Sequence, residues 1–119
     1  MSDMLEIKTR IETAIQEIGK YRRQIDELGR KRAEANMAYE MELAKTLFLL
    51  GEQETVDFDG QTHKQPPVSV REKIARGIVA NFKYEAELAD SNYKACIANL
   101  EALKTQLNGF QSINRHLDN

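Results

Sequence analysis

Apolar residues recur along most of this chain at alternating steps of three and four, with one interruption near the middle. The first series starts at Met4 and continues through Ile7, Ile11, Ala14, Ile18, Tyr21, Ile25, Leu28, Arg32, Ala35 and Tyr39. The second series consists of Phe82, Ala86, Ala89, Tyr93, Cys96, Leu100, Leu103, Leu107 and Phe110. Such spacing places an apolar stripe along an α-helix and requires a partner helix to cover it. The pattern therefore predicts an all-α fold, a long antiparallel helical hairpin of coiled-coil type.

The boundaries of the two helices follow from local signals in a single domain of residues 1–119. We expect a helix over residues 4–50, a tip loop over 51–68 and a helix over 69–114. Gly51 follows Leu49-Leu50, where a left-handed capping residue ends a helix. Ser69-Val-Arg-Glu72 matches a capping box, which predicts the start of the second helix. Gly77 can kink that helix or divide off a short first helix over residues 70–76.

The tip segment differs in composition from the two predicted helices. It contains Gly60, both prolines and the acidic residues Glu52, Glu54, Asp57 and Asp59. Residues 55–63 alternate around Asp59-Gly60, a pair that suits a type I′ turn, so a small β-hairpin is one interpretation of the tip. An irregular polar loop is the other, because two isolated strands are marginal in water.

The apolar stripe is wider than a single two-helix seam needs. Further apolar residues lie beside it on both arms, namely Ile15, Met37, Leu43, Ile78, Leu88, Ile97 and Ile113. A wide stripe needs more than one neighbouring helix, so we expect a homo-oligomer, either a dimeric four-helix bundle or a larger assembly. The residues expected to carry self-association are Ile11, Ile18, Ile25, Leu28, Tyr93, Leu100, Leu103 and Leu107.

A basic segment, Lys20–Arg32, holds six bases and two acids. Its candidate contacts to a nucleic acid or a protein partner are Lys20, Arg22, Arg23, Arg30 and Lys31. Forked arginine donors suit phosphates. The alternative is that Asp26 and Glu27 form ordinary helix-surface pairs with these bases. Arg32 differs, because the repeat places it on the stripe; we expect it to pair with Glu87 or Asp90 of the other arm.

Composition and motifs restrict the classes of function that we expect. The chain has 119 residues, a formal charge of −2, two histidines and one cysteine. It has no long apolar run for a membrane span and no signal-peptide pattern, so we expect a cytoplasmic protein without a membrane partner.

Cys96 lies on the apolar stripe, and we interpret it as a small core residue. Asp57, Asp59 and His63 lack the spacing of a calcium or zinc site. We expect no metal, no cofactor and no catalytic residue.

Three stretches carry a resemblance, Ile74-Ala-Arg-Gly-Ile-Val-Ala80, Tyr84-Glu-Ala-Glu-Leu-Ala-Asp-Ser-Asn-Tyr93-Lys and Ala102–Asn114. With the arrangement of helix, proline-containing connection and helix, the chain over roughly residues 30–114 resembles small helical-hairpin proteins from the early replication and recombination regions of phages and prophages of Gram-positive bacteria. The Asp57–Gln65 stretch is longer than is usual in that group. The resemblance implies a phage-encoded protein in a bacterial host cell and transfers no activity and no site residue.

Three functional hypotheses remain open from the sequence. The first is a non-enzymatic, self-associating accessory protein that binds an unidentified protein partner, in DNA replication, in recombination or in interference with a host protein. The second is a nucleic-acid-binding protein that uses Lys20–Arg32. The third is a holdase, because prefoldin-like chaperone subunits have a similar plan of two long helices around a β-hairpin; its client-binding residues would be Met4, Ile7, Phe110 and Ile113.

Overall fold

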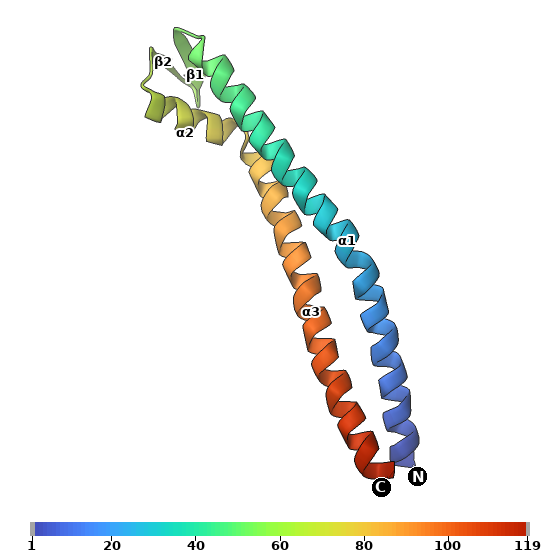
Figure 1. Cartoon of the computed structure of the whole chain (residues 1–119). Helices are drawn as coiled ribbons and strands as arrows, with labels where there is room; N and C mark the ends of the chain where they lie inside the picture. The colour runs from blue at the N-terminus through green and yellow to red at the C-terminus, as the bar shows by residue number, and fades with distance from the viewer. Residues whose placement is uncertain (1, 119) are drawn as a thin grey trace. The chain divides into compact units, whose positions relative to one another are not determined.

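The computed structural model describes residues 2–118, and this part of the chain folds into three helices and one two-stranded sheet (Figure 1). Helix α1 spans Ser2–Gly51, β1 Thr55–Phe58, β2 Gln61–Lys64, α2 Val68–Ile78 and α3 Ala80–Asp118. The chain divides into two compact units. The first unit combines the described residues up to Arg30 with those from Ser91 onward, and the second unit is Lys31–Asp90.

The first unit is an antiparallel pair of helical segments, as the apolar repeat predicts. Its core consists of Ala14 and Ile18 from α1 and Cys96 and Leu100 from α3, each with at most 6% of its surface exposed. The Cys96 thiol donates to the Tyr21 carbonyl oxygen at 3.6 Å, and the Arg10 guanidinium lies 6.0 Å from the centre of the Phe110 ring. The small side chains at Ala14 and Cys96 let the two helices approach closely.

Gly29 and Tyr93 show the same close approach within the first unit. A Cβ atom placed on Gly29 would lie 3.4 Å from Cε2 of Tyr93, a tight but tolerable contact. The glycine therefore gives the tyrosine ring room on the seam. Helix propensity alone would disfavour Gly29 by about 1 kcal/mol relative to alanine, so packing offsets a local cost here.

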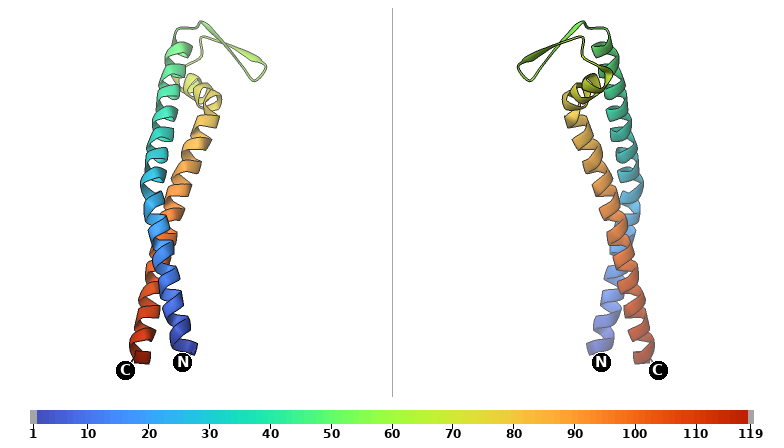
Figure 2. Two further views of the ribbon diagram at one scale, coloured as in Figure 1. Left: turned by 90° about the vertical axis from the view of Figure 1, so that its right-hand side faces the viewer. Right: turned by 90° about the vertical axis from the view of Figure 1, so that its left-hand side faces the viewer.

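The second unit has its own apolar core where α1 ends. Leu50 of α1, Val56 of β1 and Ile74 and Ala75 of α2 are buried together. Leu43, Leu47, Phe58 and Val70 pack against them. Figure 2 shows α2 beside the last turns of α1, with the β-hairpin next to it. A two-stranded sheet is marginal by itself, and the apolar face of α2 supplies the cover that it needs.

Arg71 links α2 to the end of α1. Its guanidinium donates to the carbonyl oxygens of Gly51 at 3.5 Å and Gln53 at 3.3 Å. The last turn of α1 contains no basic residue, so Arg71 supplies the positive charge that a helix C-terminus favours.

The β-hairpin at the tip is confirmed. Thr55 pairs with Lys64, and Phe58 pairs with Gln61 across a two-residue connection. The connecting residues, Asp59 and Gly60, have φ angles of 54° and 75°. Two successive positive φ angles are what a type I′ turn requires, and glycine and aspartate adopt them at low cost.

The ends of the helices at the tip lie within one residue of the expected positions, but the two predicted capping signals are wrong. The capping box at Ser69 does not form: α2 begins at Val68, its N-cap is Pro67, and no side chain caps it. The carbonyl of Pro67 already accepts the Arg71 amide at 3.0 Å, so Ser69 lies inside the first turn. Gly51 is the last helical residue of α1, whereas the positive φ angles among the described residues are at Asp59, Gly60 and Gln65.

The predicted second helix, 69–114, is divided into α2 and α3. The short first helix expected over residues 70–76 is present as α2, and the division falls at Val79, two residues beyond Gly77. Val79 is buried, and its carbonyl oxygen accepts the amides of Phe82 and Lys83. The division between α2 and α3 therefore lies at a buried β-branched residue.

The role of Gly77 is to allow close packing against α2, and not to kink the helix. A Cβ atom on Gly77 would lie 2.8 Å from Cζ of Phe58. The Phe58 ring thus lies directly against the backbone of α2. Since a real Cβ cannot come so close, any side chain at this position displaces the ring and loosens the contact between hairpin and helix.

We predict that Gly77→Ala lowers the free energy of unfolding by about 1–2 kcal/mol, because overpacking outweighs the gain in helix propensity. The matched control is Gly109→Ala, where a Cβ meets nothing within 4 Å; it should raise that free energy by up to about 1 kcal/mol. Urea unfolding followed by circular dichroism measures both. In a Phe58→Leu background, Gly77→Ala should no longer be costly, and an unchanged cost there would contradict this explanation.

Candidate functional site

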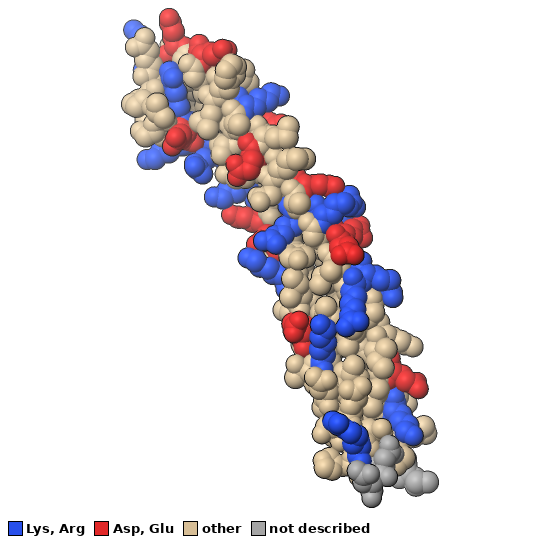
Figure 3. All heavy atoms as spheres, viewed as in Figure 1, with Lys and Arg blue, Asp and Glu red and all other residues tan. Residues whose placement is uncertain are grey.

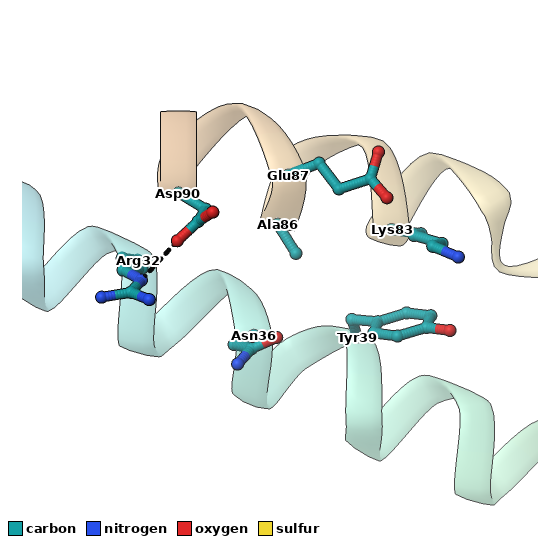
Figure 4. Close-up of a pocket in the computed structure, with 7 residues that line it drawn as sticks. All are labelled: Arg32, Asn36, Tyr39, Lys83, Ala86, Glu87 and Asp90. Atoms are coloured by element: carbon teal, nitrogen blue, oxygen red, sulfur yellow. Dashed lines mark ion pairs between the residues drawn. The ribbon is translucent and has the colours of Figure 1, made fainter. Parts of the chain in front are cut away.

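A polar pocket interrupts the apolar seam of the second unit (Figure 4). Its volume is about 270 Å³. The residues that line it are Arg32, Asn36 and Tyr39 of α1 and Lys83, Ala86, Glu87 and Asp90 of α3. All but Ala86 carry polar groups, whereas the remainder of the seam is largely apolar. The pocket is therefore the strongest concentration of polar chemistry between α1 and α3 in this unit.

The pocket contains the ion pair that the sequence predicts for Arg32. Nε of Arg32 lies 2.7 Å from Oδ1 of Asp90, with the two side chains 45% and 32% exposed. Of the two expected partners Asp90 is thus the one used, and the Glu87 side chain points away from Arg32 (Figure 4). Asp90 lies three residues beyond Glu87, about one helical turn. If two helices of equal length were joined by a short loop, Arg32 would lie opposite Glu87. The β-hairpin and α2 lengthen the connection between α1 and α3, and Arg32 pairs with Asp90 instead.

The chemistry of the pocket favours a structural role. Its charges are of both signs, and Arg32 and Asp90 satisfy each other. An enzyme site needs a nucleophile, a base and an oxyanion donor that converge on one position. Among the described residues no group of three or more histidine, cysteine, aspartate or glutamate side chains could hold a metal ion. A polar pair on an otherwise apolar seam is suited to fixing the register of two helices.

The predicted basic contacts all lie on α1 and are exposed. Lys20, Arg22, Arg23 and Arg30 belong to the first unit, and Lys31 belongs to the second. Acidic residues accompany them, and both Glu27 and Arg30 make contacts within the chain. Figure 3 shows Lys and Arg side chains interspersed with Asp and Glu along the visible face. Helix-surface pairing therefore accounts for part of this segment.

The predicted self-association stripe is largely used within the chain. Ile18 and Leu100 are buried. Half-buried positions make up the remainder: Ile11, Ile25, Leu28, Tyr93, Leu103 and Leu107. These side chains cover one another across the helix pair of the first unit, so they leave little surface for a second copy. If the chain associates with itself, other apolar residues must supply the contact.

Those other residues are exposed on the outer faces of the helices. In the second unit they include Met37, Met41 and Phe48 of α1 and Tyr84 of α3, with exposed fractions of 58%, 63%, 66% and 62%. Met37 was expected beside the main stripe, whereas Met41 and Tyr84 were not. For Met41, the signal in the sequence is a second four-three-four spacing, 37, 41, 44 and 48, which runs beside the main stripe on α1; the apolar repeat gives no such signal for Tyr84.

A hollow in the first unit combines apolar walls with two cations. It has a volume of about 440 Å³ and is lined by Ile15, Ile18, Gly19, Arg22, Lys104, Leu107 and Asn108. Of the four residues expected to bind a holdase client, Ile113 is exposed at 46%, whereas Met4, Ile7 and Phe110 are half-buried.

We predict that Arg32→Leu lowers the free energy of unfolding by about 1 kcal/mol, because the half-exposed ion pair with Asp90 is lost from the seam. The double variant Arg32→Leu/Asp90→Leu should recover at least this loss, because an apolar pair can fill the same seam. Thermal unfolding of the single and double variants measures the coupling. The control, Glu6→Gln, breaks the exposed Arg10–Glu6 pair and should cost no more than about 0.5 kcal/mol. If the double variant loses as much stability as the sum of the losses from the two single substitutions, a specific Arg32–Asp90 interaction is excluded.

Within residues 2–118, no helix combines the length and the apolar character that crossing a bilayer requires. No protein-family model, curated protein or solved structure matches this chain.

Proposed function

We propose that this chain is a non-enzymatic interaction protein that self-associates and binds a protein partner. The observation that supports the proposal is the set of large apolar side chains on the outer helix faces of both units. In the first unit these are Leu5, Ile15, Ile113 and Leu117; in the second they include Met37, Met41, Phe48, Leu49, Tyr84 and Leu88. Exposed apolar residues at helical spacing are typical of helices that pack against further helices.

The helical hairpin offers a frame for such contacts. The seam between α1 and α3 keeps each unit folded, while the outer faces stay free for other chains. The sequence resemblance supports a bacterial host and a role in phage DNA replication or recombination or in interference with a host protein. The sequence pattern supports a cytoplasmic setting. A dimeric four-helix bundle or a larger ring is the assembly that we propose.

We predict that the purified chain has a solution mass of at least twice the 13.6 kDa of one chain, and that this mass falls on dilution, because the exposed apolar area is divided among short patches. Sedimentation velocity over a hundredfold range of concentration measures it. A single species of 13.6 kDa at every concentration would refute the self-association.

Binding to nucleic acid is the second candidate, and the exposure of Lys20, Arg22 and Arg23 favours it. If it holds, a gel-shift series with duplex and single-stranded DNA should show affinity that rises steeply as salt falls, because phosphate contacts release counterions. Arg22→Gln/Arg23→Gln should then weaken binding about tenfold or more at low salt. No shift at low salt would exclude this function and leave the first proposal unaffected. A holdase role is the third candidate; its support is limited to the β-hairpin plan and the exposed Ile113.

A further inference from the structure

A second apolar stripe runs along α1 inside the second unit. It consists of Met37, Met41, Ala44 and Phe48, all four exposed. Their steps of four, three and four place them within about 60° of one another around the helix axis. These are the a and d positions of a heptad, so the stripe has the spacing of a coiled-coil seam.

This stripe is separate from the face of α1 that packs inside the chain. Leu43, Leu47 and Leu50 belong to the apolar core of the second unit. They lie about 120° around the helix from the exposed stripe. Helix α1 therefore has two apolar faces, of which its own chain covers one. A helix with two such faces is typical of bundles in which it contacts two neighbours.

Two charged residues identify the partner that fits the second face. Glu40 lies on one side of the stripe and Lys45 on the other, and both are exposed. With Met41 and Phe48 as a positions, Glu40 is a g position and Lys45 the following e position. In a parallel pair of helices a g residue faces the following e residue of its neighbour. The charges that flank the stripe on one copy are thus complementary to those on a second, parallel copy.

We infer that a second copy of this chain covers this stripe, with its α1 parallel and with Glu40 of each copy facing Lys45 of the other. The inference rests on the proposed self-association and specifies its interface. In a closed dimer with a twofold axis, the same contact occurs twice, so both Glu40–Lys45 pairs between the copies form together. The apolar layers extend from Met37 to Phe48, because the preceding position on this face is the charged Glu34 and α1 ends at Gly51.

An antiparallel pair would use the same stripe but not the same charges. Met37 would then face Phe48, and Met41 would face Ala44. Antiparallel helices place g beside g and e beside e. Glu40 would lie near Leu47 and Lys45 near Ala38, so neither charge would meet an opposite one. Charge complementarity therefore favours the parallel arrangement.

Substitution within the stripe tests whether this face is the interface. Met41→Lys should raise the dimer dissociation constant at least about tenfold, because it introduces like charges at an apolar layer. The matched control is Val68→Lys, at a similarly exposed apolar residue of α2 in the same unit, which should leave dimerisation unchanged. Sedimentation velocity measures both, and circular dichroism confirms equal helix content. If the wild-type chain dimerises and Met41→Lys dimerises equally well, the face is wrong while the proposed function stands. If the wild-type chain is a monomer, both fail.

Charge exchange tests the pairing. Glu40→Lys and Lys45→Glu should each weaken the dimer about tenfold, because each places like charges across both flanks. The double variant Glu40→Lys/Lys45→Glu should restore it, since the two pairs form again with exchanged signs. A double variant as weak as the singles would overturn the parallel contact.

Cross-linking tests the orientation. In the parallel arrangement Ala44 faces Ala44 of the other copy, so Ala44→Cys should yield a disulfide-linked dimer under mild oxidation. The wild-type chain, whose single cysteine, Cys96, is buried, should yield none and serves as the control. Absence of the covalent dimer at concentrations where the chain is dimeric would exclude the parallel orientation.

Discussion

The pairing of α1 with α3 segments within each unit is the constraint on which the remaining structure depends. An isolated helix cannot bury its own apolar stripe, and helices of this length gain most of their stability from packing against a neighbour. In the first unit the buried residues Ala14, Ile18, Cys96 and Leu100 supply that contact. Because two helices share one seam, the pairing buries one face of each and leaves the outer faces exposed. The exposed apolar residues are thus a direct consequence of the two-helix plan.

Polar and small residues on the seam give the pairing its register. Apolar side chains of similar size tolerate sliding by a heptad, whereas an ion pair and a glycine–aromatic contact each fit in one alignment. Arg32 pairs with Asp90 in the second unit, and Gly29 lies against Tyr93 in the first. Their contribution to stability is modest since the ion pair is half-exposed. Their main effect is to exclude alternative pairings.

The hairpin and α2 form a second small core that neither would form alone. Two strands of four residues bury too little apolar surface for independent stability. Here Val56 and Phe58 of β1 pack with Leu50 of α1 and Ile74 of α2, and the Phe58 ring lies against the backbone at Gly77. The tip is therefore a packed structure and not a passive connection between two helices.

Local and periodic features of this chain could be predicted from its sequence, and features set by distant contacts could not. The apolar repeat determined the two long arms, their antiparallel pairing and the position of Arg32 on the seam, and Asp59-Gly60 determined the turn, since each depends on neighbours in sequence. The choice of Asp90 over Glu87 depended on the length of the folded connection. The start of α2 at Val68, the division at Val79 and the role of Gly77 arose from packing of the hairpin against helices far along the chain. Periodicity indicates which side chains are apolar, but only the tertiary structure decided which of them its own chain covers, because burial depends on what lies opposite.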